Sequence, residues 1–305
     1  MNTANPSKQA GSILPFSFDN LPVRGRLISL RNLEEFVPAI KNTTGFVQDL
    51  LKQSLTAVVL FQQDLKADQS LTLQIVSNSS IKLVIAQAMA DGTIKAYADV
   101  AEDNSIETFE NFVKQNPRIV ITVDNKGKTY QSVIPAVGTS LKDTITEYYE
   151  QSVQNKTYLN FIEHKDSNFA LMLQHLPTEQ VSKDDWSRLA MVADTLTAEE
   201  TTSLLHYEII QRIFAEDITR IYDENLLNFY TEVDKVRMEK AIKSLGLLQC
   251  RELLKDGDIE MTDQFSGLTE TFKHEDIARI FEEMKDDLRE IKAKKEAEEA
   301  ANKGE

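Results

Sequence analysis

The sequence predicts an α+β protein with an N-terminal domain of mixed or antiparallel sheet and helices, a helical linker region, and a small C-terminal helix-hairpin-helix domain. Three observations support this organisation. A long amphipathic helix pattern stands beside several segments in which apolar and polar residues alternate. After Pro177 the composition shifts to an acidic helical stretch. Two short helical patterns and a hairpin pattern follow near the end of the chain.

The N-terminal domain is expected at residues 13–177, after a disordered lead-in at residues 1–12. Apolar stretches come first, and apolar residues three or four positions apart then predict a buried-face helix. Period-2 segments bounded by turn-forming residues predict antiparallel strands. The apolar stretches are 13–18 and 23–30, the helices 46–65 and 141–153, and the strands 70–76, 81–86, 93–98, 118–123, 129–134, 158–164 and 169–175.

The next region, residues 178–230, is acidic and helical. It holds eleven acidic and four basic residues, a net charge of −7, which is nearly half of the net charge of −15 on the chain. Ser182 precedes an acidic first turn, and Thr197 with Glu200 three residues later forms a capping-box pattern. These signals predict two helix starts, and apolar residues at helical spacing fill the second half of the region.

The C-terminal domain is expected at residues 231–281 and a charged helical tail at 282–305. Helical patterns cover residues 235–245 and 247–255. A small hairpin is expected from segments 259–265 and 268–272, and a final helix starts near His274.

Composition and charge exclude several classes of function. A net charge of −15 disfavours nucleic-acid binding, which depends on Lys and Arg at phosphates. The longest apolar runs are far shorter than the roughly 20 residues that span a bilayer, and the N-terminus lacks the apolar core of a secretory signal. A cytoplasmic protein that binds no membrane is therefore expected. The single Cys250 can form neither an intramolecular disulfide nor a thiolate metal site, and it lies on the apolar side of a short helix.

The sequence contains no catalytic motif. It has no nucleophile elbow, no phosphate-binding loop and no dinucleotide fingerprint. Its four histidines share no metal-ligand spacing, so each is interpreted as a surface or structural residue. We therefore predict no catalytic residue and no enzyme activity.

Motifs along nearly the whole chain resemble the 33 kDa chaperonin family. They occur in the family's order, and each is weak alone, but seven or more in register over about 270 residues are hard to obtain by chance. The motifs include residues 15–30 (PFSFDNLPVRGRLISL), 70–76 (SLTLQIV), 130–135 (YQSVIP), 171–177 (LMLQHLP), 185–186 (DW), 205–220 and 257–280.

The resemblance implies an ATP-independent holdase chaperone that binds unfolding proteins and forms a homodimer when active. It also implies a zinc site of four cysteines, which serves as a redox switch. The ligand positions fall on Thr231, Val233, Asp263 and Ser266. These residues cannot provide four thiolates, so neither zinc nor the thiol switch is expected here.

Clients are expected to bind an apolar stripe in the linker region, which either opens under heat or another stress or is partly open at all times. The alternative is a divergent enzyme or protein-interaction subunit that has kept the fold. The candidate client-binding residues are Ile209, Ile210, Ile213, Phe214, Ile218, Ile221, Tyr222, Leu226, Leu227, Phe229 and Tyr230.

Overall fold

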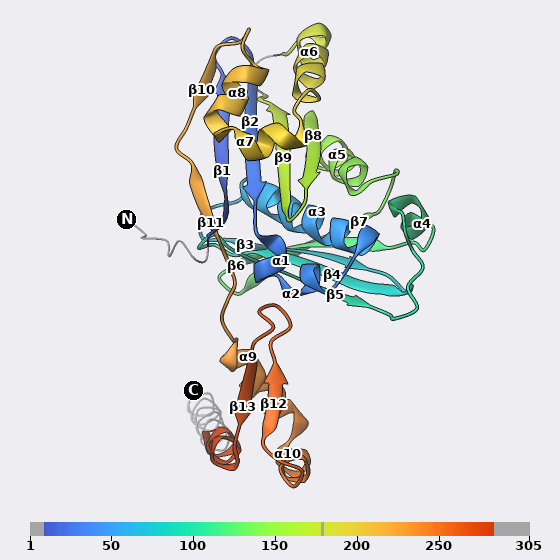
Figure 1. Ribbon diagram of the computed structural model, residues 1–305, viewed down its shortest axis with the longest axis vertical. Coiled ribbons are helices and arrows are strands. Elements are labelled where there is room, and N and C mark those ends of the chain that lie inside the picture. The colour runs from blue at the N-terminus through green and yellow to red at the C-terminus, as the bar shows by residue number, and fades with distance from the viewer. Residues whose placement is uncertain (1–8, 178–179, 284–305) are drawn as a thin grey trace, which may run out of the picture. The chain divides into compact units, whose positions relative to one another are not determined.

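The computed structural model describes residues 9–177 and 180–283, and the chain divides into two compact units, Met1–Thr231 and Glu232–Glu305 (Figure 1). Within the described residues, the larger unit contains an eleven-stranded sheet and the smaller one a two-stranded hairpin. Ten strands of the large sheet follow the order β7-β6-β3-β4-β5-β11-β1-β2-β9-β8, and β10 pairs with β1. The α+β class predicted from the sequence is confirmed.

The elements of the larger unit follow the sequence patterns closely. Every strand predicted between residues 70 and 175 is present, and the two predicted helices appear as α3 and α5. Three helices of four or five residues were not predicted, because such short segments show no helical period. The strands are β1 (Gln9–Phe18), β2 (Val23–Leu30), β3 (Ser70–Val76), β4 (Ile81–Ala88), β5 (Thr93–Val100), β6 (Arg118–Asn125), β7 (Lys128–Pro135), β8 (Thr157–His164), β9 (Ser167–His175), β10 (Thr219–Ile221) and β11 (Asn225–Phe229). The helices are α1 (Leu33–Phe36), α2 (Pro38–Lys41), α3 (Gly45–Gln62), α4 (Phe109–Val113), α5 (Leu141–Gln151), α6 (Lys183–Ala193), α7 (Ala198–Ser203) and α8 (His206–Ile213).

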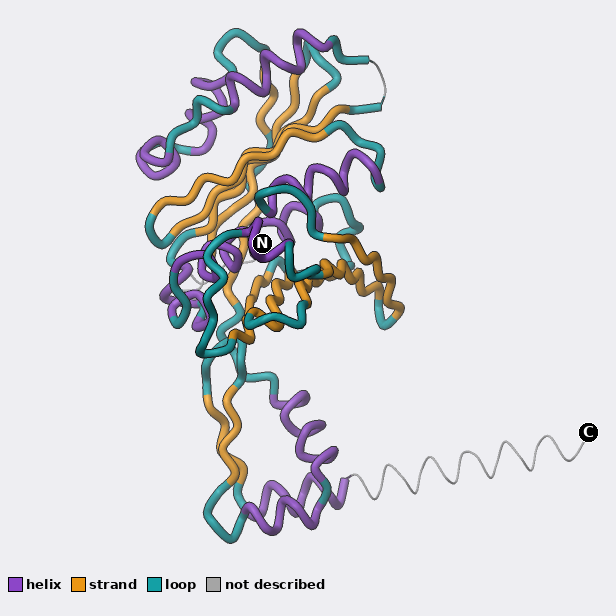
Figure 2. Tube along the Cα trace, turned by 90° about the vertical axis from the view of Figure 1, so that its right-hand side faces the viewer, coloured by secondary structure: helices purple, strands orange, loops and turns teal. Residues whose placement is uncertain are grey.

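The strands β1, β2 and β9 are buried on both faces of the sheet. Successive side chains of a strand point to opposite faces of the sheet. In β9, Ala170 and Met172 belong to the core that includes α3, whereas Phe169, Leu171 and Leu173 belong to a second core with α6, α7 and α8. Figure 2 shows helices on both sides of this part of the sheet.

Strand β11 joins the two halves of the large sheet. It pairs in parallel with β5 and antiparallel with β1, and β10 continues the pairing along β1. The sequence pattern predicted a helical stripe from Ile209 to Tyr230, and this prediction is wrong for the residues after Phe214. Apolar residues at helical spacing were misleading here, because backbone pairing with β1 and β5 fixes this segment as strands.

The prediction that residues 1–12 are a disordered lead-in is also wrong for residues 9–12. Strand β1 begins at Gln9, and Ala10 and Ser12 are buried. The small and polar residues at this end of the strand carry no apolar signal, but they pair with β2 and β11. Gly11 is required because a Cβ atom there would stand 1.7 Å from the carbonyl oxygen of Ser29. Residues 1–8 lie outside the described residues.

The smaller unit consists of helices around one hairpin, as predicted. It contains α9 (Lys235–Leu245), α10 (Leu247–Leu253), β12 (Ile259–Thr262) and β13 (Thr269–Phe272), and a helix begins at His274 and is described through Glu283. Its core includes Met238, Ile242, Cys250 and Phe272. Most of the predicted charged tail, residues 284–305, lies outside the described residues.

Candidate functional site

The helices α6, α7 and α8 cover an apolar face of the sheet and form the candidate site; we call residues 183–217 the helical segment. The predicted helix starts are confirmed. The Ser182 side chain accepts a hydrogen bond from the backbone N–H of Asp185, and Thr197 with Glu200 forms a complete capping box. Figure 1 shows the segment lying over β1, β2, β9 and β8.

The buried centre of the contact between the helical segment and the sheet is apolar. Ile209, Ile210, Ile213 and Phe214 are buried against residues of the sheet. The sheet side of this core consists of Leu14, Phe16, Phe18, Val23, Leu27, Ile162, Phe169, Leu171 and Leu173. Transfer of such apolar side chains out of water stabilises the docked segment.

Aromatic rings form the centre of this contact. The ring of Phe214 lies 5.7 Å from that of Phe16 and 5.0 Å from that of Phe18, measured between centroids. Gly25 of β2 leaves room for Phe16, because a Cβ atom on Gly25 would stand 2.0 Å from Phe16 Cζ. A larger residue at position 25 would therefore displace the ring on which Phe214 packs.

The structure divides the predicted client-binding residues into three groups. Ile209, Ile210, Ile213 and Phe214 face the sheet from the helical segment, whereas Leu227 and Phe229 lie in the core that includes α3. The remaining residues lie at the surface or partly so. Ile218, Tyr222 and Leu226 are exposed, and Ile221 and Tyr230 are partly buried.

Polar contacts fasten α6 to its surroundings. Arg188 forms a bidentate ion pair with Asp217, with N–O distances of 2.8 and 2.7 Å, and the side chain of Asp217 is only 2% exposed. Tyr158 of β8 donates a hydrogen bond of 2.6 Å to Asp194 at the end of α6. Burial and this contact with Asp194 raise the pKa of Tyr158 well above its ordinary value, so the phenol stays protonated and keeps donating.

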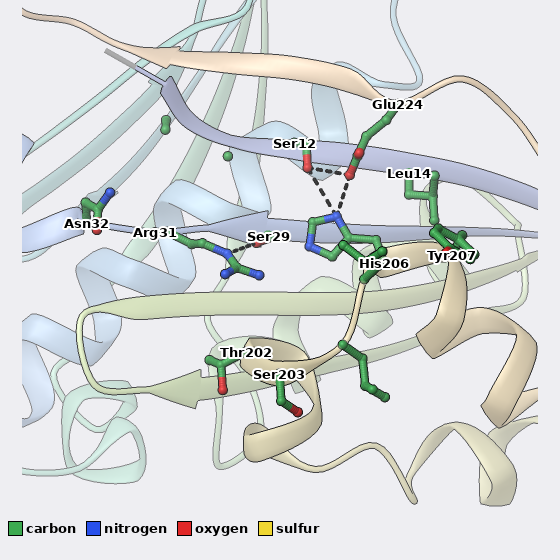
Figure 3. A pocket seen from close by; sticks show the side chains of 14 residues that line it. Ser12, Leu14, Ser29, Arg31, Asn32, Thr202, Ser203, His206, Tyr207 and Glu224 are labelled. Carbon is green, nitrogen blue, oxygen red and sulfur yellow. Dashed lines mark hydrogen bonds and ion pairs between the residues drawn. The ribbon is translucent and has the colours of Figure 1, made fainter. Parts of the chain in front are cut away.

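A cavity of about 680 Å³ lies where α7 and α8 meet β1 and β2 (Figure 3). Ser12 of β1 donates a hydrogen bond of 2.6 Å to Glu224 Oε1, and its Oγ lies 3.3 Å from His206 Nδ1. His206 Nδ1 also contacts Glu224 Oε1. Arg31, directly after β2, lines the same cavity and donates to the backbone oxygen of Thr201 in α7.

The serine, histidine and carboxylate in this cavity do not have the geometry of a nucleophile relay. In such a relay, the serine and the carboxylate contact opposite nitrogens of the imidazole. Here Ser12 and Glu224 share Nδ1, and Nε2 is buried with no partner among the described residues. The sequence interpretation of His206 as a structural residue agrees with this contact, but the cluster itself had no sequence signal.

As the pH falls, the helical segment is expected to lose stability before the sheet does. Burial acts to raise the pKa of Glu224, but hydrogen bonds from Ser12 and His206 outweigh it and leave this pKa below its usual value. A hydrogen bond from the backbone of Thr197 lowers the pKa of Glu200. A carboxyl group with a lowered pKa stabilises the folded state above its ordinary pKa of about 4.3 and loses this effect as the pH falls through the lowered value.

In the β8–β9 hairpin the net shift is the opposite, because burial there outweighs the hydrogen bonds and raises the pKa values of Glu163 and Asp166. These two groups therefore stabilise the folded state more as the pH falls. Between about pH 5 and 3 we expect the protection factors of amides, which compare exchange with its intrinsic rate at each pH, to fall more in α7 and α8 than in β8 and β9. An equal loss of protection in both regions, at an ionic strength that screens the surface charges, would contradict this expectation.

The residues at the four zinc-ligand positions do not fit a zinc ion. Thr231 ends the larger unit, and the other three positions lie in the smaller one. Val233 packs partly buried on the apolar core and has no donor atom. The carboxylate of Asp263 accepts hydrogen bonds from the backbone N–H groups of Phe265 at 2.9 Å and Ser266 at 3.0 Å, so it caps the hairpin turn. Within the described residues, no three His, Cys, Asp or Glu side chains are grouped to hold a metal ion.

Cys250 is buried in the smaller unit, and its thiol contacts the backbone oxygen of Ile242 at 3.7 Å. Burial raises the pKa of this thiol, which lowers the fraction present as reactive thiolate. We expect Cys250→Ser and Cys250→Ala variants to keep the native response to peroxide, measured by aggregation assays before and after oxidation. Loss of that response in both variants would show that the thiol is accessible after all.

Comparison with known proteins identifies the family to which this architecture belongs. The model of the Hsp33 protein family matches residues 11–273. The chain belongs to the Hsp33 family. The resemblance to the 33 kDa chaperonins found in the sequence is thus confirmed, and a single cysteine fits a member without the four zinc-binding cysteines.

Individual relatives agree with this assignment to the Hsp33 family. The 33 kDa chaperonin of Nitrosococcus oceani is 29% identical over 274 residues, covering 88% of this chain and 93% of the relative. That of Pseudomonas aeruginosa is 28% identical over 276 residues, covering 87% and 93%. The crystal structure of the Thermotoga maritima 33 kDa chaperonin has the same fold, with a TM-score of 0.71 at 15% identity over 90% of this chain and 99% of that one. Family and relatives support a chaperone function.

Proposed function

We propose that this protein is an ATP-independent holdase that binds unfolding proteins and prevents their aggregation. The apolar contact between the helical segment and the sheet, in a member of a chaperone family, supports this function most directly. Helices α7 and α8 have six and eight residues, and helices of this length are not stable in water without a packing partner. Undocking therefore unfolds the segment and uncovers apolar surface on both sides of the contact.

The charge of the helical segment suits a surface that holds unfolding chains in solution. Exposed acidic residues repel one another and lower the free energy needed to open the segment. After opening, they surround apolar surface with charge and keep a complex with a client soluble. Ile209, Ile210, Ile213 and Phe214 are candidates that opening would uncover. Ile218, Ile221, Tyr222, Leu226, Leu227, Phe229 and Tyr230 stay candidates at or near the paired strands.

The proposed activity does not depend on an intramolecular zinc or disulfide switch. The purified protein is expected to contain no stoichiometric zinc, and a chelator should leave its thermal unfolding unchanged. The physical reason is that Val233 offers no ligand atom and Asp263 is engaged in the hairpin turn. Elemental analysis that finds one zinc ion per chain would contradict this prediction.

Ser12, His206 and Glu224 are not arranged as a nucleophile relay, because serine and carboxylate share one ring nitrogen, and the absence of enzyme activity stays a prediction. The alternative of an enzyme or interaction subunit on this fold therefore gains no support from the cavity. No helix among the described residues is both long and apolar enough to cross a bilayer. A cytoplasmic location, a homodimer, and the absence of nucleic-acid and membrane partners stay predictions.

Light scattering of a thermally unfolding model protein, with no ATP present, tests the holdase function. Suppression of scattering at near-stoichiometric ratios of this protein to the model protein is expected. An unrelated acidic protein at the same concentration serves as the control for nonspecific charge effects. No suppression at any temperature below the unfolding of the large sheet would overturn the proposal.

A further inference from the structure

One carboxylate oxygen connects three elements at the edge of the helical segment. Glu224 Oε1 accepts a hydrogen bond from Ser12 of β1 and contacts Nδ1 of His206, the first residue of α8. The side chains are partly withdrawn from water, with exposed fractions of 14% for His206 and 37% for Glu224. Figure 3 shows all three side chains converging at the rim of the cavity.

The two sides of this junction differ in how firmly they are held. Ser12 lies within β1, and Glu224 lies between β10 and β11, which both pair with β1. His206, in contrast, belongs to an eight-residue helix that depends on its packing against the sheet. When the helical segment undocks, Ser12 and Glu224 stay with the sheet and His206 leaves.

A second contact fastens the preceding helix at the same cavity. Arg31, the residue after β2, donates from Nη2 to the backbone oxygen of Thr201 at 3.1 Å and from Nε to Ser29 Oγ at 3.0 Å. Its guanidinium also lies over the ring of Phe169, 5.4 Å from the centroid. The connection between α7 and α8 is thus held to the sheet on both sides by polar contacts.

The junction also carries a cost that undocking removes. His206 Nε2 is buried without a partner among the described residues. A buried polar atom without a hydrogen bond destabilises the state that contains it, and water would satisfy this nitrogen once the helix leaves. The unpartnered nitrogen therefore lowers the free energy needed to undock α8, although the contact through Nδ1 holds the helix in place.

We propose that His206, held by Glu224 and Ser12, is an autoinhibitory latch that keeps α7 and α8 over the apolar face of the sheet and sets the threshold at which the helical segment opens. This inference rests on the proposed function, because the latch regulates exposure of the proposed client-binding surface. It requires no thiol and no metal ion. It is therefore available to a chain with one buried cysteine.

Hydrogen exchange of the full chain, measured at fixed pH and temperature, tests the latch independently of chaperone activity. In His206→Ala and Glu224→Gln variants, amides of α7 and α8 are expected to exchange about tenfold faster, the effect of losing a hydrogen bond to a charged group. Exchange in β3 and β4 should be unchanged. Glu224→Gln removes the charge of the acceptor and His206→Ala removes its partner, so both changes weaken the same contact, and the double variant should exchange no faster than the faster single variant.

A neighbouring substitution and a milder variant serve as controls. Tyr207→Ala changes an exposed residue that lines the same cavity, and it should leave exchange unchanged. Ser12→Ala removes one donor to Glu224 while keeping the strand, so it should give a smaller acceleration even if the other variants fold poorly. Exchange within twofold of native in both His206→Ala and Glu224→Gln, or additive effects in the double variant, would overturn the latch. Faster exchange without any gain in aggregation suppression would support the latch and contradict the proposed function.

Discussion

Replacing Phe214 by aspartate is expected to open the helical segment at temperatures at which the native protein stays closed. The side chain is 1% exposed and packs against Phe16 and Phe18. Loss of a buried phenylalanine costs about 3–5 kcal/mol, and an unpaired buried carboxylate adds a further penalty. In the open segment the aspartate is hydrated, so the substitution shifts the equilibrium toward opening by more than about 100-fold.

Hydrogen exchange combined with an aggregation assay checks this result. Amides of the helical segment should lose protection in Phe214→Asp and Ile213→Asp, whereas strands β3, β4 and β6 keep theirs, because their core lies against α3. Met191→Asp adds the same charge at a position of α6 that is 65% exposed, and it should have little effect. Retained protection in both buried variants would show that the segment does not open by release from the sheet.

The same variants test where clients bind. An open variant leaves the apolar face of the sheet intact, so we expect Phe214→Asp to suppress aggregation at temperatures at which the native protein does not. A fall in suppression, despite an open segment, would place clients on the helical residues Ile213 and Phe214 themselves. Unchanged suppression in an open variant would place client binding elsewhere and contradict the proposal for this surface.

Sequence periodicity predicts the local structure of this chain well for helices and strands that have one buried face and one exposed face. Strand β3 and helix α9 begin and end at the predicted residues, because alternation and helical spacing both depend on nearest neighbours along the chain. Strands β10 and β11 escaped prediction for the opposite reason. They are three and five residues long, and their pairing with β1 brings together residues about 200 positions apart.

The candidate site was predictable only in part, for the same physical reason. The apolar stripe at Ile209, Ile210 and Ile213 is visible in the sequence because a helix repeats every 3.6 residues. The contact of His206 with Ser12 and Glu224 joins residues 194 and 18 positions apart, and only the topology of the sheet brings them together. No local pattern could have indicated it.

Breaking the ion pair between Arg188 and Asp217 is expected to be the second large perturbation of the helical segment. Arg188→Met keeps the apolar stem but leaves a carboxylate that is 2% exposed without its partner. Because the Arg188 side chain is 33% exposed, the loss should lie between the about 0–1 kcal/mol of an exposed pair and the about 3–5 kcal/mol of a fully buried one. Arg212→Met is the matched control, because Arg212 is 42% exposed and its partner Glu200 is 25% exposed.

The position of this pair determines how the helical segment opens. Arg188 lies in α6, and Asp217 lies in the turn after α8, so the pair fastens the first helix to the end of the last. In the native protein the three helices should therefore undock together, whereas in Arg188→Met hydrogen exchange should show α8 opening at lower free energy than α6. The double variant Arg188→Met with Asp217→Asn should recover part of the lost stability, because it removes the unpaired charge. If Arg188→Met lowers the thermal midpoint no more than Arg212→Met does, the pair is not a structural link between the helices.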